Sequence, residues 1–312
     1  MQLDIGSNVL LALGGLYAIV VVASAWVLWL RWRAPEKDRT ELVQRVRSWW
    51  LIVSIFTVAM IMSRNVSVAF FAFVSFLALK EYFSIVPTRR ADRRVLFWAY
   101  LSVPVQYYWV GRAWYGMFIV FIPVYVFLLL PMRMVIVGET KEFLRAAGTL
   151  HWGIMTLVFG ISHIAYLLVL PEANNPKAGG PGLVLFLVFL TQFNDVAQYL
   201  WGKNLGRHKI IPKVSPNKTW EGFLGGVATT TLLSVLLSGW LTPMPWTVAS
   251  AAGLLISIAG FIGDVTISAL KRDIGLKDSG RMLPGHGGIL DRIDSLTYTA
   301  PLFFHFIYYL YY

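Results

Sequence analysis

The sequence predicts an all-α integral membrane protein that crosses the bilayer many times. Hydrophobic residues make up 57% of the chain and charged residues only 14%, whereas a soluble domain carries about 25% charged residues. The mean hydropathy is +0.63. Apolar runs of about 20 residues recur along the chain, which is the length of a helix that crosses the hydrocarbon core. These observations exclude a soluble globular fold.

The apolar segments predict about nine or ten transmembrane helices. In chain order they cover roughly 8–30, 49–63, 66–86, 95–111, 115–131, 151–170, 182–201, 223–241, 247–268 and 295–312. Only Arg64 and Asn65 separate the second segment from the third, so this pair is either a tight hairpin or a re-entrant element. Removing both members together leaves every later loop on the same side of the membrane.

The first segment is expected to be an uncleaved helix whose N-terminus lies outside the cell. It is too long for a signal-peptide core, and no basic residue precedes it. On the alternating path that follows, the inner loops hold almost all of the 27 Lys and Arg residues, and the outer loops hold only Arg64, Arg112 and Lys177. This asymmetry satisfies the positive-inside rule and predicts a multi-pass protein of the inner (cytoplasmic) membrane. The excess of Lys and Arg in the inner loops then accounts for most of the net charge of +11, and no nucleic-acid partner is expected.

Two predicted helices carry ionisable residues inside their apolar runs, where a charge is costly without a partner or a task. Asp195 lies in the segment 182–201, and Gln198 falls on the same helix face three positions later. Glu81 lies beside Lys80 near the inner end of the third segment, and for this pair a structural role and a functional one are both open.

Asp264 is a third such residue, in the segment 247–268. Ser268 and Lys271 follow it on the same side of the helix. One interpretation is a structural salt bridge between Asp264 and Lys271. The other is that Asp264 is a ligand in a polar site at the inner membrane surface.

The loop 202–221 contains a stiff basic segment with the sequence KIIPKVSPNKTWEG. Pro212 and Pro216 restrict its backbone, Lys218 contributes a cation, and Ser215 contributes a hydroxyl. The loop is therefore suited to binding an anionic group. The alternative is a basic cytoplasmic loop that is attracted to anionic lipid headgroups.

The stretch 268–294 holds the highest density of charge in the chain. Asp291 and Asp294 are three residues apart and share a helix face, so with Asp264 they form a candidate site for a divalent cation. Because the chain has no cysteine, only oxygen or imidazole ligands are available, and oxygen ligands suit Mg²⁺. Nearby Lys and Arg side chains and the glycine turn suit polyphosphate. His286 either contacts a phosphate or shapes that turn.

This stretch resembles the signature of CDP-diacylglycerol synthases, also called phosphatidate cytidylyltransferases. The matching positions are Ser268, Leu270, Lys271, Arg272, Lys277, Asp278, Gly280, Pro284, His286, Gly287, Gly288, Asp291, Arg292 and Asp294. Further positions that match in the right order are Gly263 and Asp264, residues 215–222, and Asp195 with Tyr199 and Gly202.

The resemblance is clear over roughly residues 190–295, and earlier in the chain it is limited to Glu81 and the hydropathy. One position departs from it, because Gln198 stands where a small residue is expected. We therefore divide the chain into N-terminal transmembrane helices over 1–150 and a C-terminal catalytic region over 151–312.

The resemblance implies a Mg²⁺-dependent reaction in which CTP and phosphatidic acid give CDP-diacylglycerol and pyrophosphate. It implies that Asp264 and Asp291 are metal ligands, with a second cation at roughly 3.5–4 Å, and that Asp294 is a ligand or orients one. Lys271 would act in catalysis. The residues expected to bind the phosphates or donate to them are Ser215, Lys218, Ser268, Arg272, Lys277, His286 and Arg292, and Asp195 and Glu81 are further candidates.

Two other functions stay open. A CTP-dependent polyprenol or phytol kinase would release CDP instead of pyrophosphate. A transporter or flippase of anionic lipid would use Asp195 and Asp264 as coupling sites, although no inverted repeat is visible in the sequence. The expected partners are CTP, phosphatidic acid and membrane lipids, and whether the chain forms a homodimer is open.

Overall fold

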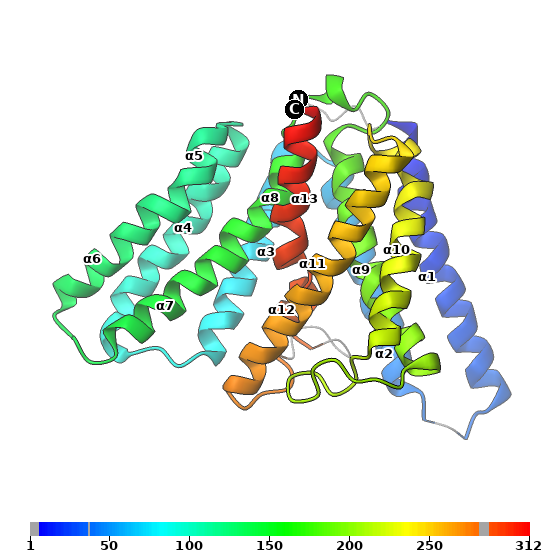
Figure 1. The fold of residues 1–312 in the computed structure, drawn as a ribbon, viewed down its shortest axis with the longest axis horizontal. Helices are drawn as coiled ribbons and strands as arrows, with labels where there is room; N and C mark the ends of the chain where they lie inside the picture. Colours follow the sequence, from blue (N-terminus) through cyan, green and yellow to red (C-terminus); the bar gives the residue numbers. More distant parts are fainter. Residues whose placement is uncertain (1–5, 37, 281–286) are drawn as a thin grey trace.

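The computed structural model describes residues 6–36, 38–280 and 287–312, which form helices and no β-strand (Figure 1). In chain order the helices are α1 Ser7–Arg33, α2 Thr40–Ile61, α3 Arg64–Ile85, α4 Arg93–Gly111, α5 Tyr115–Val120, α6 Phe127–Val137, α7 Phe143–Ile154, α8 Ile161–Leu167, α9 Gly179–Leu205, α10 Trp220–Leu241, α11 Trp246–Asp273, α12 Leu290–Ile293 and α13 Leu296–Tyr311. The prediction of an all-α polytopic membrane protein is confirmed.

Seven helical segments of the described chain are long and apolar enough to cross a membrane. They are Ser7–Arg33, Arg64–Ile85, Tyr115–Val137, Phe143–Leu167, Gly179–Leu205, Trp220–Leu241 and Trp246–Asp273. Two of them contain π-helical turns, at Phe121–Val126 between α5 and α6 and at Met155–Gly160 between α7 and α8. The other predicted spans correspond to α2, α4 and α13, so the count of about nine or ten and the orientation stay predictions.

The second and third predicted segments correspond to two helices of 22 residues each, α2 and α3, which pack against each other. Helix α3 is long and apolar enough to cross a membrane, and the choice between a hairpin and a re-entrant element stays a prediction. Helix α2 begins well before the apolar run, because polar residues extend it outward and Glu41 pairs with Arg45 at 2.6 Å. The division after residue 150 falls inside α7, and it stays a prediction.

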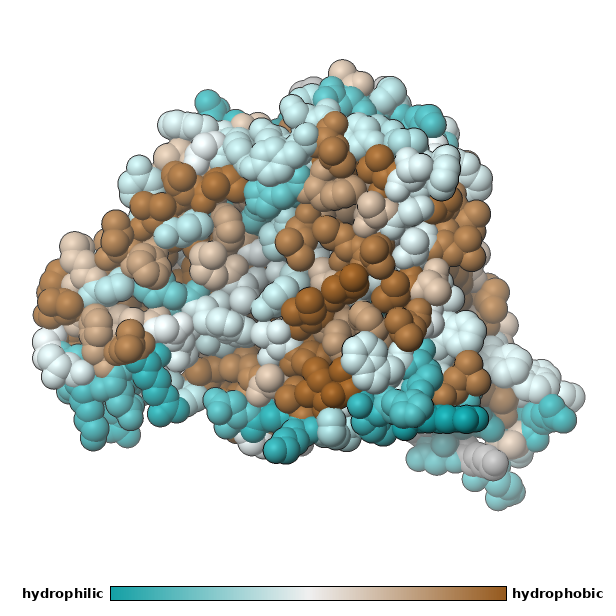
Figure 2. Space-filling view, in the orientation of Figure 1, coloured by the Kyte–Doolittle hydropathy of each residue, from teal (hydrophilic) through white to brown (hydrophobic). Residues whose placement is uncertain are grey.

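A central group of helices has a further group of helices on each side of it (Figure 1). Helix α8 is buried along its whole length and packs against α3 and α13. Helices α4 to α7 lie on one side of this centre, and α9, α10 and α11 pack against one another on the other side. Figure 2 shows apolar residues across the middle of this face and hydrophilic residues along its lower edge.

The polar loops that carry the candidate residues meet at one end of the bundle. Helix α9 ends and α10 begins there, and α11 ends close by (Figure 1). Helix α1 begins and α13 ends at the opposite end. Loops that are far apart in the sequence are therefore brought to the same end of the molecule.

Candidate active site

The loop between α9 and α10 is held by its own backbone. Lys209 and Thr219 pair in an antiparallel bridge, and the N–H of Ile210 donates to the carbonyl of Lys218 at 3.1 Å. The hydroxyl of Thr219 then accepts from the N–H of Gly222 at 3.2 Å and caps α10. These contacts hold the backbone on both sides of Lys218.

Lys218 reaches from this loop into a polar cluster between α9 and α11. Its Nζ lies 2.7 Å from Oδ2 of Asp264 and donates to Oε1 of Gln198 at 3.0 Å. Burial opposes the charge on Lys218, but Asp264 and Asp195 outweigh it, so the pKa of Lys218 is raised. The acidic neighbours thus stabilise the charged form of this lysine.

Three carboxyl groups surround this cation. Oδ1 of Asp264 accepts from the hydroxyl of Ser268 at 3.3 Å, and Oδ2 of Asp195 accepts from the hydroxyl of Ser295 at 2.9 Å. Asp294 completes the group, and burial together with the charges of Asp264 and Asp195 raises the pKa of Asp294 well above its ordinary value. The cluster therefore holds more acidic groups than its lysine can neutralise.

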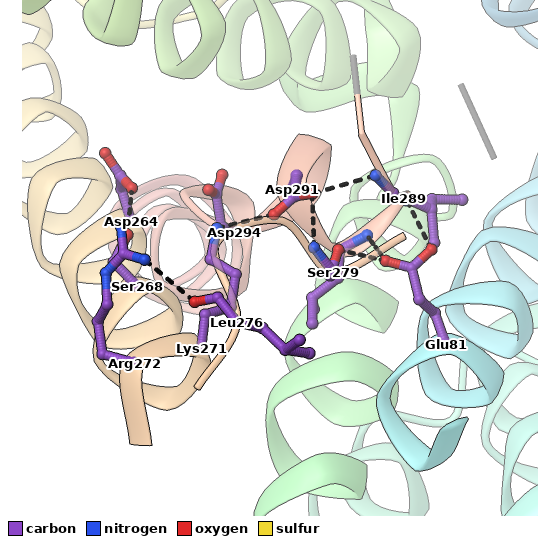
Figure 3. Close-up of polar contacts among 12 residues, drawn as sticks. Glu81, Asp264, Ser268, Lys271, Arg272, Leu276, Ser279, Ile289, Asp291 and Asp294 are labelled. Carbon is purple, nitrogen blue, oxygen red and sulfur yellow. Dashed lines mark hydrogen bonds and ion pairs between the residues drawn. The ribbon is translucent and has the colours of Figure 1, made fainter. Parts of the chain in front are cut away.

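A second ion pair lies next to this cluster, at the start of α12 (Figure 3). Nζ of Lys271 lies 2.7 Å from Oδ1 of Asp291, and Oδ2 of Asp291 accepts from the backbone N–H groups of Ser279 and Gly288 at 3.0 and 3.1 Å. Burial raises the pKa of Asp291, but Lys271 and these N–H groups outweigh it, and the net pKa is lowered. The predicted structural alternative, a salt bridge between Asp264 and Lys271, is wrong, because each residue pairs with a different partner.

Glu81 of α3 anchors the stretch that contains Asp291. Its carboxylate accepts from the backbone N–H groups of Ile289 and Leu290 at 2.9 and 3.1 Å and from the hydroxyl of Ser279 (Figure 3). A Cβ atom at Gly288 would lie 2.0 Å from Oε1 of Glu81 and 2.5 Å from Oγ of Ser279, so any other residue would displace these two side chains. The N-terminal half of the chain therefore contributes directly to the site.

Gly287, which precedes Gly288, is required for a different reason. Gly287 has φ +80°, a left-handed backbone conformation that favours glycine. A Cβ atom there would also lie 2.6 Å from Oδ2 of Asp291. The two consecutive glycines thus allow the loop to approach both carboxylates.

Two other predicted residues, Arg272 and Ser215, contact the backbone of the α9–α10 loop. Arg272 is exposed, and it donates to the backbone carbonyls of Val214 and Leu276 at 3.3 and 3.1 Å, which ties the end of α11 to the α9–α10 loop. Ser215 lies in the turn just before Lys218, with its backbone carbonyl accepting from the lysine N–H at 3.2 Å. Arg272 therefore positions the loop that carries Lys218.

Two further cations have no hydrogen-bonding partner for their charged groups within the described chain. Lys277 is exposed, and Nε of Arg292 is buried without a partner. The backbone carbonyl of Arg292 accepts from the side chain of Gln192 at 3.2 Å. His286 lies outside the described residues.

Mg²⁺ was predicted to bind Asp264 and Asp291. In the described part of the chain no three His, Asp or Glu side chains are grouped as a ligand set, and Asp264 and Asp291 are each engaged by a lysine. The chemistry of the donors fits a hard cation, because all are carboxylates and Oδ1 of Asp195 is buried without a partner. Mg²⁺ binding at this site stays a prediction.

Sequence reasoning did not select Ser279, Ser295 or the role of Gln198. Ser279 is buried and connects Asp291 to Glu81, and Ser295 donates to Asp195. Neither serine is among the positions that resemble the cytidylyltransferase signature, so nothing in the sequence distinguished Ser279 and Ser295. The departure at Gln198 was visible, but its contact with Lys218 depends on the folded loop.

Most of this chain is similar to known proteins. A model of the cytidylyltransferase family matches residues 43–310. A protein of Escherichia coli strain K12 with the name uncharacterized protein YnbB is 47% identical over 298 residues, which are 96% of this chain and 98% of the relative.

Two enzymes with a stated activity match over a shorter length. A phosphatidate cytidylyltransferase of Synechocystis sp. is 48% identical over 114 residues, 36% of this chain and 39% of the enzyme. A phosphatidate cytidylyltransferase of Staphylococcus aureus strain COL is 39% identical over 127 residues, 40% of this chain and 49% of the enzyme. The likeness to these two enzymes therefore covers less than half of each.

Proposed function

Because this chain belongs to the cytidylyltransferase family, we propose that it transfers CMP from CTP to phosphatidic acid and gives CDP-diacylglycerol and pyrophosphate. The observation that carries this proposal is the pair of adjacent lysine–carboxylate contacts at one end of the membrane bundle, Lys218 with Asp264 and Lys271 with Asp291. The sequence likeness to two phosphatidate cytidylyltransferases supports the same substrate.

The reaction requires little covalent chemistry from the protein. An oxygen of the phosphatidic acid phosphate attacks the α-phosphorus of CTP, and the bond from that phosphorus to the bridging oxygen of the β-phosphate breaks. Pyrophosphate leaves with the electrons of that bond. Since the attacking phosphate is already an anion, the protein has to neutralise charge and align the two anions.

The cations of the site are suited to this task. Lys218 and Lys271 are each held close to a carboxylate. We infer that each lysine exchanges its carboxylate for a phosphate oxygen when the substrates bind. Lys277 and Arg292, whose charged groups form no hydrogen bond or ion pair within the described chain, would bind further phosphate oxygens.

The same exchange would free carboxylates for a cation. Asp264 would then bind Mg²⁺, and Asp291, Asp195 and Asp294 are the neighbouring acids that complete its surroundings or hold a second cation. Bound Mg²⁺ supplies charge neutralisation on the triphosphate.

The location of the site is consistent with both substrates. CTP is soluble in the cytosol, whereas phosphatidic acid has its tails in the membrane. The site lies at the end of the bundle where the basic loops gather, next to helices that are apolar enough to span the bilayer. We propose that this end faces the cytosol, with the protein in the cytoplasmic membrane.

Product analysis tests the proposal. The purified protein is incubated with phosphatidic acid and Mg²⁺ and with CTP labelled at either the α- or the γ-phosphate. A cytidylyltransferase puts the α-label into the lipid and the γ-label into pyrophosphate. Transfer of the γ-label to lipid with release of CDP would instead identify a lipid kinase, and lipid movement without any CTP consumption would identify a transporter.

A further inference from the structure

A second basic site lies away from the candidate active site, between the start of α4 and the end of α6. A cavity of about 500 Å³ is lined there by four arginines, Arg90, Arg93, Arg94 and Arg133. Figure 2 shows hydrophilic side chains gathered at this corner of the molecule, at the lower left, below an apolar surface. None of these arginines belongs to the Lys218 and Lys271 clusters.

Among the described residues, the four arginines form no ion pair. The neighbouring Arg89 pairs with Asp92 at 2.6 Å, but no ion pair joins the four to a carboxylate within the described residues. The guanidinium of Arg133 lies 5.3 Å from the ring centre of Trp98, which orients it without changing its charge. The positive-inside rule accounts for arginines on this side of the membrane, but it does not require them to converge on one cavity. Three of them, Arg90, Arg93 and Arg94, are exposed, so solvent screens part of their mutual repulsion, and an anion bound among the four would offset it directly.

The other wall of the cavity is apolar and continues into the membrane-facing surface. Ile136 and Val137 of α6 line the cavity. Val135 and Ile136 are 66% and 64% exposed, and Leu128, two turns earlier on the same helix, is 64% exposed. A ligand that occupies the cavity is thus in contact with cations on one side and with hydrocarbon-facing side chains on the other.

We propose that this cavity binds the phosphate of an anionic phospholipid, with the acyl chains of the lipid along the exposed face of α6. Arginine guanidinium groups match phosphate oxygens in geometry, and basic cavities between helices at the cytoplasmic surface bind anionic headgroups. A soluble phosphate would satisfy the arginines but would leave the apolar wall in water, so the lipid fits the site better. The site is separate from the catalytic residues, and this proposal does not depend on the reaction proposed above.

Lipid binding to the delipidated full-length protein tests this site. Phosphatidylglycerol is added to the protein in a neutral detergent, and bound lipid is counted by native mass spectrometry. We use phosphatidylglycerol because it is anionic but is not the proposed substrate. The triple variant R90Q/R94Q/R133Q is expected to bind the tightest lipid about tenfold or more weakly, because it removes three of the four guanidinium groups that line the cavity.

The matched control removes the same number of charges elsewhere on the cytoplasmic side. The variant R31Q/R45Q/R47Q, whose residues lie at the ends of α1 and α2, is expected to bind the lipid as the wild type does. Equal losses of lipid affinity in the two triple variants would show that binding depends only on net charge, and this would overturn the proposal. Unchanged binding in R90Q/R94Q/R133Q would overturn it too.

Two further arms identify the ligand. Zwitterionic phosphatidylcholine is expected not to occupy the site, and millimolar inorganic phosphate is expected not to displace phosphatidylglycerol. Full displacement by inorganic phosphate would show that the site takes a soluble anion and would overturn the assignment to lipid. If the triple variant is not recovered folded, the single variants R93Q and R133Q provide the same comparison, each with an expected loss of a few fold.

Discussion

The carboxylate of Glu81 accepts a hydrogen bond of 2.9 Å from the backbone N–H of Ile289, although 208 positions of sequence separate the two residues. The same carboxylate accepts from the N–H of Leu290 and from the hydroxyl of Ser279. Through these contacts α3 holds both ends of the loop that positions Asp291. A residue of the N-terminal half thus supports the candidate site residues of the C-terminal half.

We predict that Glu81→Gln loosens this loop and lowers activity by about tenfold or more, since an amide presents N–H to donors that need an acceptor. Hydrogen–deuterium exchange at the amides of Ile289 and Leu290 should become faster in this variant. Lys80→Gln is the control, because Lys80 is the exposed neighbour on the same helix. Unchanged exchange at both amides would show that Glu81 does not hold the loop.

Asp264→Asn is expected to reduce CDP-diacylglycerol formation by about 100-fold or more, because the carboxylate positions Lys218 and is the proposed cation ligand. Activity is measured as CTP-dependent lipid labelling in detergent, and folding by the melting temperature. Asp273→Asn, an exposed site at the end of the same helix, is the control. Near-normal turnover in Asp264→Asn would remove this residue from the active site.

Lys271→Ala should destabilise the protein as well as inactivate it. The Lys271 and Asp291 side chains are only 11% and 7% exposed, so loss of the lysine leaves a buried carboxylate without its cation. Such a loss costs about 3–5 kcal/mol, and a lower melting temperature in detergent should report it. Lys277→Ala removes an exposed lysine that has no partner within the described chain, and it should leave the melting temperature unchanged while weakening substrate binding.

Gln198→Ala is expected to lower activity by about tenfold, since a hydrogen bond to a charged group contributes roughly 1.5 kcal/mol. The bond in question joins Oε1 of Gln198 to Nζ of Lys218. If Gln198 acts through this lysine, its substitution should have little further effect in a Lys218→Met background. Additive losses in the double variant would show that Gln198 acts independently of Lys218.

Removal of divalent cations should abolish the reaction reversibly. Treatment with EDTA is expected to stop CDP-diacylglycerol formation, and added Mg²⁺ should restore it. Asp195→Asn should raise the Mg²⁺ concentration needed for half-maximal activity, because Oδ1 of Asp195 is a buried acceptor without a partner. Full activity in EDTA would contradict the proposed role of a divalent cation.

Much of the fold was predictable because its signals are local. A long apolar run indicates a membrane helix without reference to the rest of the fold. The ends of α9, α10 and α11 accordingly lie close to the ends of the predicted segments 182–201, 223–241 and 247–268. The extensions missed at α2 and α7 have a common cause, since charged and amphipathic turns continue these helices beyond the apolar run that marks them.

The candidate residues of the stretch 268–294 were also identified from the sequence, but their partners were not. Spacing along one helix placed Lys271 on the side of Asp264, yet the lysine pairs with Asp291, and Asp264 pairs with Lys218. Helical periodicity limits which side chains share a face and does not reveal which other element packs against that face.

Hydropathy and residue spacing were enough to predict an α-helical membrane protein with a dense polar site near the ends of its C-terminal helices, because both patterns extend over only a few helical turns. The contact of Glu81 with the loop before Asp291 and the pairing of Lys218 with Asp264 became visible only in the folded protein. These contacts link segments that are distant in the sequence, and they depend on how the helices pack in three dimensions.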